Sequence, residues 1–115
     1  EAETYMTEDA DIIVAAYGAV ARIAKSAVHS ARELGIKAGL VRPITLWPFP
    51  SDIIKKSAEN AKKILVTEMS MGQMVDDIKL AVECRIPVHF YGRTGGVVPT
   101  PDEVLNEIKK LGGVQ

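Results

Sequence analysis

The stretch IKAGLVRPITLWPFPS, residues 36–51, joins a predicted buried strand to a predicted helix. The apolar run Ile36–Val41 comes first, and three prolines follow within residues 42–50. Proline fixes φ and has no N–H, so residues 42–50 should form a stiff loop that cannot join a sheet ladder. Trp47, the only tryptophan, and Phe49 lie in this loop. Either they dock against a partner, or they cover the domain's own core, as large aromatic side chains often do.

The composition is that of an ordinary globular domain. With 115 residues, 47% hydrophobic and 25% charged, the chain is large enough for one core of its own. Its 14 Lys and Arg residues balance 15 Asp and Glu residues, so the net charge does not favour nucleic acid or an anionic membrane as a partner. No apolar run approaches the roughly 20 residues of a membrane span, and no signal peptide is visible. Cys84 is the single cysteine, which excludes an internal disulfide and favours a cytoplasmic location.

Short apolar runs alternate with stretches of helical periodicity along the chain. Parallel strands covered on both faces are apolar throughout, whereas a helix repeats its apolar residues every three or four positions. We therefore predict an α/β domain, a three-layer αβα sandwich with a mostly parallel sheet of four or five strands. The predicted strands are Ile12–Ala16, Ile36–Val41, Ile64–Val66 and Pro87–Tyr91, the last nearer the sheet edge, with Glu3–Met6 as a possible antiparallel edge strand. The predicted helices are Val20–Leu34, Ser51–Ala61, Gly72–Val82 and Pro101–Leu111.

Residues at the ends of these helices match known capping patterns. Gly35 is expected to close the first helix as its C′ residue, and Ser51 can cap the second. Thr100 and Glu103 stand three positions apart, which predicts a capping box for the last helix. Helical spacing on the second helix predicts that four apolar residues face the core, namely Ile53, Ile54, Ala58 and Ala61.

A crevice is expected beyond the carboxyl ends of the strands, where ligands bind in sheets of this type. The first and third parallel strands should be neighbours at the point where the strand order reverses. Glu68 could act there as a base or pair with a partner's arginine, and the helix start at Gly72 could hold an anion. We favour a structural or interface role for the Glu68 carboxylate over a catalytic one. The residues predicted to line the crevice are Tyr17, Gly18, Glu68, Ser70, Gly72 and Gln73.

Two further features have a functional and a structural interpretation. Residues 92–96, Gly-Arg-Thr-Gly-Gly, resemble a phosphate cradle beside a cation, although we favour a turn-rich loop between a strand and a helix. His29 is expected on the solvated polar face of the first helix, and His89 is expected to be packed inside a strand. Neither has partners at metal-ligand spacing, so we predict no metal site. The polar face of the first helix also carries Arg22, Lys25 and Arg32.

Three motif pairs together carry a family resemblance. They are Arg42-Pro43 with Pro48-Phe49-Pro50, Glu68 with Gly72-Gln73-Met74, and Gly95-Gly96 with Pro99-Thr100-Pro101. In this order they resemble the C-terminal domain of the alpha subunit of 2-oxoacid:ferredoxin oxidoreductases, and the 2-oxoglutarate and 2-oxoisovalerate branches more than the pyruvate branch. The resemblance covers about Asp9 to Leu111 and implies a transketolase C-terminal-domain-like fold.

The resemblance implies a complete enzyme that decarboxylates a 2-oxoacid oxidatively. Such an enzyme uses thiamine diphosphate and Mg²⁺, passes electrons through iron–sulfur clusters to ferredoxin and transfers the acyl group to coenzyme A. This chain has no thiamine diphosphate motif of the Gly-Asp-Gly type, and one cysteine cannot hold a four-cysteine cluster. We therefore expect those cofactors before Glu1 or in other subunits. Residues 1–115 are expected to be a single domain, the C-terminal fragment of a longer subunit.

The resemblance therefore implies an accessory domain that is inactive alone and has no catalytic residues of its own. We expect it to pack against other domains and subunits of the oxidoreductase through Arg42, Trp47, Phe49, Gly95 and Gly96. Two alternatives stay open. One is a free-standing α/β module that binds a small molecule or serves as a scaffold. The other is the C-terminal domain of a transketolase or of an E1-beta-type enzyme, which would share the fold without the electron acceptor.

Overall fold

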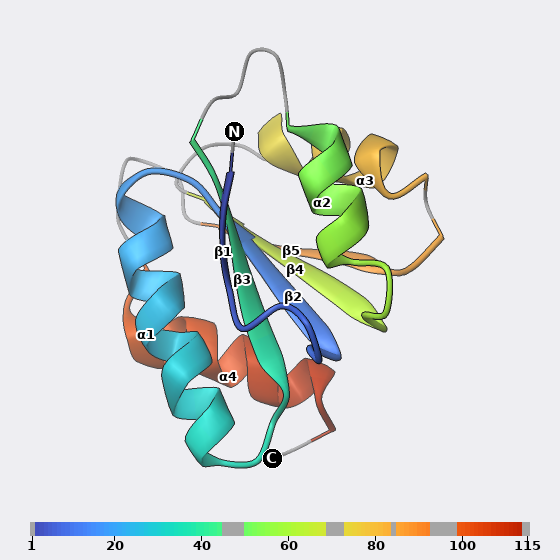
Figure 1. The fold of residues 1–115 in the computed structure, drawn as a ribbon. Helices are drawn as coiled ribbons and strands as arrows, with labels where there is room; N and C mark the ends of the chain where they lie inside the picture. Colours follow the sequence, from blue (N-terminus) through green and yellow to red (C-terminus); the bar gives the residue numbers. More distant parts are fainter. Residues whose placement is uncertain (1, 45–49, 69–72, 84, 93–98, 114–115) are drawn as a thin grey trace.

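The computed structural model describes residues 2–44, 50–68, 73–83, 85–92 and 99–113, which form one sheet between two pairs of helices (Figure 1). The strands are β1 (Ala2–Tyr5), β2 (Ile12–Ala16), β3 (Ala38–Pro43), β4 (Lys63–Glu68) and β5 (Val88–Gly92). The helices are α1 (Ala19–Glu33), α2 (Ser51–Ser57), α3 (Gln73–Ala81) and α4 (Pro101–Leu111). None of the helices in the described ranges is long and apolar enough to cross a membrane.

The five strands are arranged in the order β1-β3-β2-β4-β5. β2 pairs in parallel with both β3 and β4, β4 pairs in parallel with β5, and β1 pairs antiparallel with β3. Parallel neighbours cannot be joined by tight turns, so the helices serve as the crossovers between them. The predicted mostly parallel sheet, with an antiparallel edge strand near the amino terminus, is confirmed. β5 lies at the other edge of the sheet, as expected.

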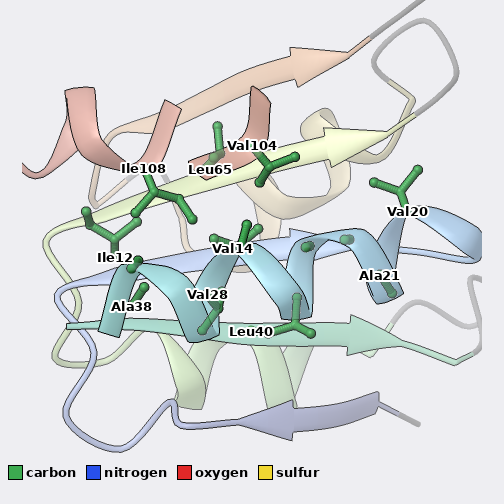
Figure 2. Close-up of a cluster of buried hydrophobic side chains, with 14 of the residues drawn as sticks. Ile12, Val14, Val20, Ala21, Val28, Ala38, Leu40, Leu65, Val104 and Ile108 are labelled. Atoms are coloured by element: carbon green, nitrogen blue, oxygen red, sulfur yellow. The ribbon is translucent and has the colours of Figure 1, made fainter. Parts of the chain in front are cut away.

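Alternate residues of the central strands supply two cores, because successive side chains of a strand point to opposite faces of the sheet. Val14, Leu40 and Leu65 face α1 and α4, and Figure 2 shows this core from the α1 side. Val41 and Val66 face α2 and α3 on the other side. Every residue of β2 is buried, since helices cover both faces of this strand. The predicted three-layer αβα sandwich is confirmed.

The start of β3 differs from the prediction. The strand begins at Ala38 rather than at Ile36. Residue 36 completes the turn after α1, with its N–H donating to the Ala31 carbonyl oxygen at 2.9 Å. The next carbonyl, that of Lys37, accepts from the N–H of Asp11 at 2.8 Å. Ile36 is nevertheless buried, so its apolar character reflects packing under α1 and α4 rather than membership of the strand.

The second helix is shorter than predicted and begins differently. α2 ends at Ser57 rather than Ala61, and Ala61 reaches the core from the turn that follows. Ser51 is the first helical residue rather than the N-cap, and no side chain caps this helix. The prediction that both isoleucines face the core is wrong for Ile53, which is 36% exposed, and right for Ile54, which is 1% exposed. Adjacent helical residues point about 100° apart, so a single turn of this helix buries only one of them.

The capping patterns predicted for the first and last helices are confirmed, whereas α3 ends at Ala81 rather than at the predicted Val82. Gly35 follows the C-cap of α1 with φ at +84°, a conformation that a residue with a Cβ rarely adopts. Thr100 and Glu103 form the capping box, in which Thr100 Oγ1 accepts from the Glu103 N–H at 3.2 Å and Glu103 Oε1 accepts from the Thr100 N–H at 3.0 Å. The remaining oxygen of Glu103 accepts from the Tyr91 hydroxyl at 2.6 Å. This carboxylate therefore joins α4 to the edge strand β5.

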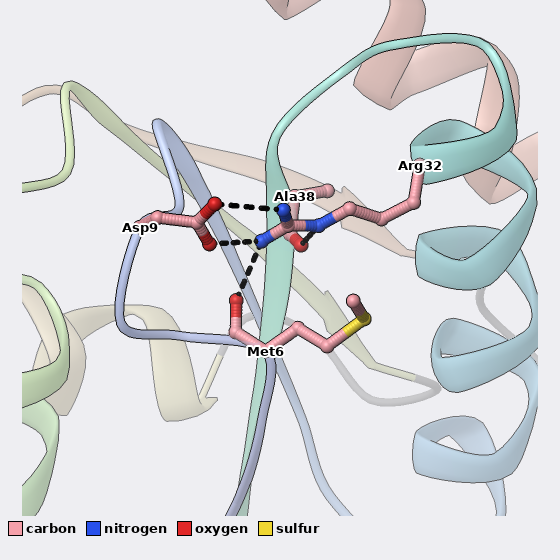
Figure 3. Close-up of polar contacts among 4 residues, drawn as sticks. All are labelled: Met6, Asp9, Arg32 and Ala38. Atoms are coloured by element: carbon pink, nitrogen blue, oxygen red, sulfur yellow. Dashed lines mark hydrogen bonds and ion pairs between the residues drawn. The ribbon is translucent and has the colours of Figure 1, made fainter.

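Arg32 is largely enclosed, although the sequence placed it on the solvated face of its helix. Its side chain is 18% exposed and all of its donor atoms are engaged (Figure 3). Nε donates to the Ala38 carbonyl oxygen at 2.8 Å, and Nη2 donates to the Met6 carbonyl oxygen at 2.8 Å. The two Nη groups also donate to the Asp9 carboxylate, at 3.1 Å and 2.7 Å. One arginine thus ties α1 to the start of β3 and to the segment between β1 and β2.

A close backbone approach explains why β3 contains Gly39. A Cβ at this position would lie 2.5 Å from the Met6 carbonyl oxygen and 2.9 Å from the Thr7 Cα. Real Cβ atoms do not come so near to backbone atoms, so only glycine lets the segment between β1 and β2 cross over the start of β3. Together, Gly39 and Arg32 fix where the edge strand β1 leaves the sheet.

Candidate functional site

The candidate crevice lies where β2 and β4 end side by side. Ala16 of β2 pairs with Thr67 of β4, so Tyr17 and Glu68 follow at the same level of the sheet. From β2 the chain enters α1 on one face of the sheet, and from β3 it returns through α2 on the other face. The predicted reversal of strand order between the first and third parallel strands is therefore confirmed.

The two residues that follow β2, Tyr17 and Gly18, are both exposed. Tyr17 is 43% exposed. Gly18 has φ at +67° and is the N-cap residue of α1, without a side-chain cap. A positive φ of this kind is accessible to glycine at little cost, so Gly18 allows the sharp change of direction from strand to helix.

Glu68 is the best-defined polar group of the crevice. It is the last residue of β4 and only 6% exposed. Its Oε2 atom accepts from the backbone N–H of Met74 at 3.0 Å, at the start of α3. A carboxylate at this position satisfies an N–H that has no partner within the helix and complements the positive end of the helix dipole. This contact supports the structural interpretation of Glu68.

Thr67 precedes Glu68 and carries a buried hydroxyl. Its side chain is 0% exposed, and Oγ1 has no hydrogen-bond partner in the part of the chain that the structure describes. Buried hydroxyls are usually bonded, because leaving one without a partner costs about 1–3 kcal/mol. The carboxyl end of β4 therefore carries one carboxylate held by α3 and one polar atom without a partner in the described ranges.

The other predicted residues fall in three groups. Gln73 is the first residue of α3. Arg42 lies near the end of β3, where its side chain is 46% exposed and Nη1 is 3.5 Å from Glu3 Oε1, so it belongs to the β1 edge of the sheet rather than to the crevice. The remaining predicted residues lie outside the described residues, namely Ser70, Gly72, Trp47, Phe49, Gly95 and Gly96.

The sequence predicted the exposure of one histidine correctly and that of the other wrongly. His29 is exposed as expected, and its Nε2 is 3.9 Å from Glu33 Oε1 on the same helix. The prediction that His89 is packed is wrong, because this residue of β5 is exposed. β5 is an edge strand, and α4 packs on α1 and β4 instead of covering it. Among the described residues no three His, Cys, Asp or Glu side chains gather as metal ligands would, and the absence of a metal site stays a prediction.

Asp9 and Glu83 have lowered pKa values, and both lie away from the candidate crevice, toward the amino ends of the strands. Hydrogen bonding from Arg32 lowers the pKa of Asp9. Hydrogen bonding and charge from Lys55, 3.0 Å away, lower the pKa of Glu83, with a smaller effect from Arg85. Ion pairs of this kind stabilise the charged form of an acid. They tie helix ends to neighbouring segments and do not indicate a reaction site.

The contacts that join distant segments were not predicted from the sequence. The Tyr91–Glu103 hydrogen bond and the Arg32–Asp9 pair connect residues 12 and 23 positions apart. Glu103 had already been assigned to the capping box, and Arg32 has the spacing of an ordinary solvated residue. The only available signal was the acidic segment before β2, which offered a partner for a cation near the end of α1.

The family comparison matches residues 10–104 to pyruvate:ferredoxin oxidoreductase core domain II. The chain is 49% identical over 111 residues to ketoisovalerate oxidoreductase subunit VorB of Methanothermobacter marburgensis, with 96% of this chain and 31% of that protein covered. It is 41% identical over 102 residues to 2-oxoglutarate synthase subunit KorA of the same organism, with 89% of this chain and 27% of that protein covered. The chain therefore spans less than a third of the length of these relatives.

Solved structures share the fold at lower sequence identity. A chain of the 2-oxoglutarate:ferredoxin oxidoreductase from Magnetococcus marinus superposes with a TM-score of 0.80 and 22% identity, over 96% of this chain and 19% of that one. A split-gene transketolase, an inactive beta4 tetramer, gives a TM-score of 0.79 and 19% identity, over 96% of this chain and 40% of that one. The second likeness shows that the fold is transketolase C-terminal-domain-like. With the family match and the two relatives, it confirms the resemblance seen in the motifs: the chain belongs to the core domain II family of 2-oxoacid:ferredoxin oxidoreductase alpha subunits.

Proposed function

We propose that this domain serves as an accessory, assembly-forming part of a thiamine-diphosphate-dependent 2-oxoacid:ferredoxin oxidoreductase. The observation that carries the proposal is the match of residues 10–104 to core domain II, together with 49% identity to a ketoisovalerate oxidoreductase subunit. The complete cytoplasmic enzyme would convert a 2-oxoacid to acyl-CoA, release carbon dioxide and reduce ferredoxin. Its reactive chemistry would be that of its cofactors, and this domain would position other parts of the enzyme.

The cofactors of that reaction do not fit the residues present here. A four-thiolate iron–sulfur cluster needs four cysteines, and the chain has only Cys84. Magnesium bound with a diphosphate needs carboxylate or carbonyl oxygens that converge, and the described residues contain no such group of three acidic, His or Cys side chains. The one buried carboxylate of the crevice, Glu68, is already bonded to the start of α3. The residues present therefore support no catalytic step within this domain.

The proposed partners are the other domains and subunits of the oxidoreductase, with ferredoxin and coenzyme A as partners of the complete enzyme. The structure from Magnetococcus marinus is described with 2-oxoglutarate, coenzyme A and succinyl-CoA bound. The matched chain of that structure is about five times as long as the segment matched here, since the match covers 19% of it. For this protein, the residues proposed to meet its neighbours are Arg42, Trp47, Phe49, Gly95 and Gly96.

A domain exchange tests the proposal. In the ketoisovalerate oxidoreductase of Methanothermobacter marburgensis, the matched 111 residues of VorB would be replaced by this chain. If the domain is an assembly part, the chimaeric enzyme should assemble and retain 2-oxoacid-dependent reduction of a viologen dye. A second chimaera, carrying the transketolase segment of the same fold in that position, serves as the control and should fail to assemble. An equally active transketolase chimaera, or a failure of this chain to assemble, would overturn the proposal.

Calorimetry on the 115-residue chain with thiamine diphosphate and Mg²⁺ tests the expected inertness of the domain by itself. No heat of binding is expected, because the sequence has no thiamine diphosphate motif and the described residues contain no cluster of metal ligands. Binding with a micromolar Kd would place part of the cofactor site in this domain and contradict the accessory role.

A further inference from the structure

A groove runs between the edge strand β1 and the helix α1, on the side of the sheet that α1 covers. Figure 2 shows α1 lying across β2 and β3, with β1 beyond the helix. The space left between them has a volume of about 680 Å³ and lies in the range of small-molecule sites. Gly18, at the start of α1, is one of its lining residues, so the groove adjoins the candidate crevice.

The floor of the groove is made by cross-strand pairs of β1 and β3. Tyr5 pairs with Leu40, and Glu3 pairs with Arg42. Because side chains alternate along a strand and Leu40 packs in the core under α1, both pairs face α1. Leu40 is only 4% exposed, and the Tyr5 ring is partly buried against the same core. The groove therefore has an aromatic and aliphatic floor.

The rim of the groove carries an excess of positive charge. Among the described residues that line the groove, Arg22 and Lys25 of α1 and Arg42 of β3 supply three positive charges, and Glu3 supplies one negative charge. The whole chain has a net charge of −1, so this excess is local. Arg22 and Lys25 stand three residues apart, which places them on the same side of the helix.

These cations are only weakly satisfied by the protein. Arg22 has no ion-pair or hydrogen-bond partner in the described ranges. Lys25 Nζ lies 4.9 Å from the centre of the Tyr5 ring, a cation–π contact that leaves the ammonium free to bind an anion. The Arg42–Glu3 distance is 3.5 Å, and both side chains are about half exposed or more, so water weakens their attraction. Three cations above an apolar floor match a ligand that joins an acidic group to an apolar body.

We propose that the β1–α1 groove binds a small organic anion. Its carboxylate or phosphate group lies among Arg22, Lys25 and Arg42, and its apolar part covers Tyr5 and Leu40. The proposal shares Arg42 with the proposed assembly surface and otherwise uses residues outside that surface. It is tested without any partner subunit.

The test is a titration of the ¹⁵N-labelled 115-residue chain followed by amide chemical shifts. Phenyl phosphate and benzoate serve as the two acidic probes, and benzyl alcohol serves as the neutral probe of similar shape. The acidic probes should shift the amides of Tyr5, Gly18 and Arg22 and saturate, and the stronger of them tells whether phosphate or carboxylate is preferred. Binding should weaken as salt is added, because exposed charges are screened. Absence of saturable shifts with both acids, or equal shifts with benzyl alcohol, would overturn the proposal.

Substitutions locate the site. The double variant Arg22→Gln, Lys25→Gln should weaken the better probe by roughly tenfold or more, because it removes two charge-assisted contacts. The control, Lys109→Gln with Lys110→Gln, makes the same change of charge at the end of α4 and should leave the Kd unchanged. Arg42→Gln removes a positive charge on β3 instead of α1 and should also weaken binding. Equal losses in the control and in the α1 variant would mean that net charge, rather than this groove, attracts the probe, and the proposal would fail.

Discussion

Arg32 and Asp9 form a two-pronged ion pair, with Nη2 2.7 Å from Oδ1 and Nη1 3.1 Å from Oδ2 (Figure 3). The same guanidinium donates to two backbone carbonyl oxygens, those of Met6 and Ala38. A planar fork with several donors can hold four oxygens of three residues at once, which a lysine ammonium cannot do in this geometry. The contact fixes the antiparallel edge strand to the parallel part of the sheet.

Arg32→Lys is therefore expected to destabilise the chain by about 2 kcal/mol, because the ammonium keeps the charge and loses most of the hydrogen bonds. Urea unfolding followed by circular dichroism measures the change. Arg22→Lys, an exposed arginine on the same helix, is the matched control and should change stability by no more than about 0.5 kcal/mol. Equal effects of the two substitutions would show that the Arg32 contacts contribute nothing beyond charge.

The stability of the chain should fall in acid partly through Asp9. Hydrogen bonding from Arg32 lowers the pKa of this carboxyl below its ordinary value of 3.8. A lowered folded-state pKa contributes stability that is fully present above the ordinary value and is lost as the pH falls through the folded-state pKa. Asp9→Asn should remove this part of the loss of stability in acid. The part that comes from Glu83, whose pKa is lowered by Lys55, should remain. Urea unfolding from neutral pH down to about pH 2 gives the two curves to compare. Parallel curves for the two proteins would contradict the assignment.

Tyr91→Phe is expected to weaken the attachment of α4 to β5. The substitution deletes a hydroxyl that donates to Glu103 Oε2 at 2.6 Å and changes little else. A hydrogen bond to a charged group contributes about 1.5–3 kcal/mol, and partial access to water should place this one at the lower end. Tyr17→Phe, at a ring that is 43% exposed, removes the same atom where water replaces it and should have little effect. Thermal unfolding of both variants is the measurement. Equal melting temperatures would contradict a stabilising hydrogen bond between Tyr91 and Glu103.

Glu68→Gln should loosen the start of α3. An amide oxygen can still accept from the Met74 N–H, but the favourable charge at the helix terminus is lost, at a cost of about 1 kcal/mol. Faster hydrogen exchange at Met74 is the direct measurement, with Glu59→Gln at an exposed site as the control. In the chimaeric enzyme the same variant should change assembly or stability more than turnover at saturating 2-oxoacid. A large loss of turnover with intact assembly would instead favour a catalytic role for Glu68.

Trp47→Ala separates the two interpretations of the proline-rich loop, which lies outside the described residues except at its ends. If the ring is an anchor between domains, the substitution should cost roughly 2 kcal/mol or more of association and leave the melting temperature of the single domain unchanged. If the ring fills the domain's own core, it should cost about 3–5 kcal/mol of folding stability. Melting curves of the 115-residue chain and size-exclusion chromatography of the chimaera distinguish them. A collapsed melting temperature would remove Trp47 from the proposed interface.

The predictions from sequence succeeded where the deciding residues are close together in the chain. The apolar run of β2 and the three- and four-residue spacing along α1 gave the element types, and the Thr100–Glu103 pair gave a capping box that the structure reproduces. The neighbouring positions of β2 and β4 also followed, because right-handed crossovers leave few arrangements for alternating strands and helices. The predictions for Ser51 and Ile53 were wrong. The helix that contains them has too few turns for its residue spacing to show which side is buried.

By itself, then, the sequence determined the fold class, the capping box and the family, since these depend on local periodicity and on motifs read in order. Only the tertiary structure decided that Arg32 is enclosed, that His89 is exposed and that Glu68 is bonded to the start of α3. Each of these depends on which distant segment lies beside the side chain, and Arg32 meets Asp9 across 23 positions. The polarity of a residue specifies that it needs a partner or water, and the packing of helices against the sheet determines which of the two it finds.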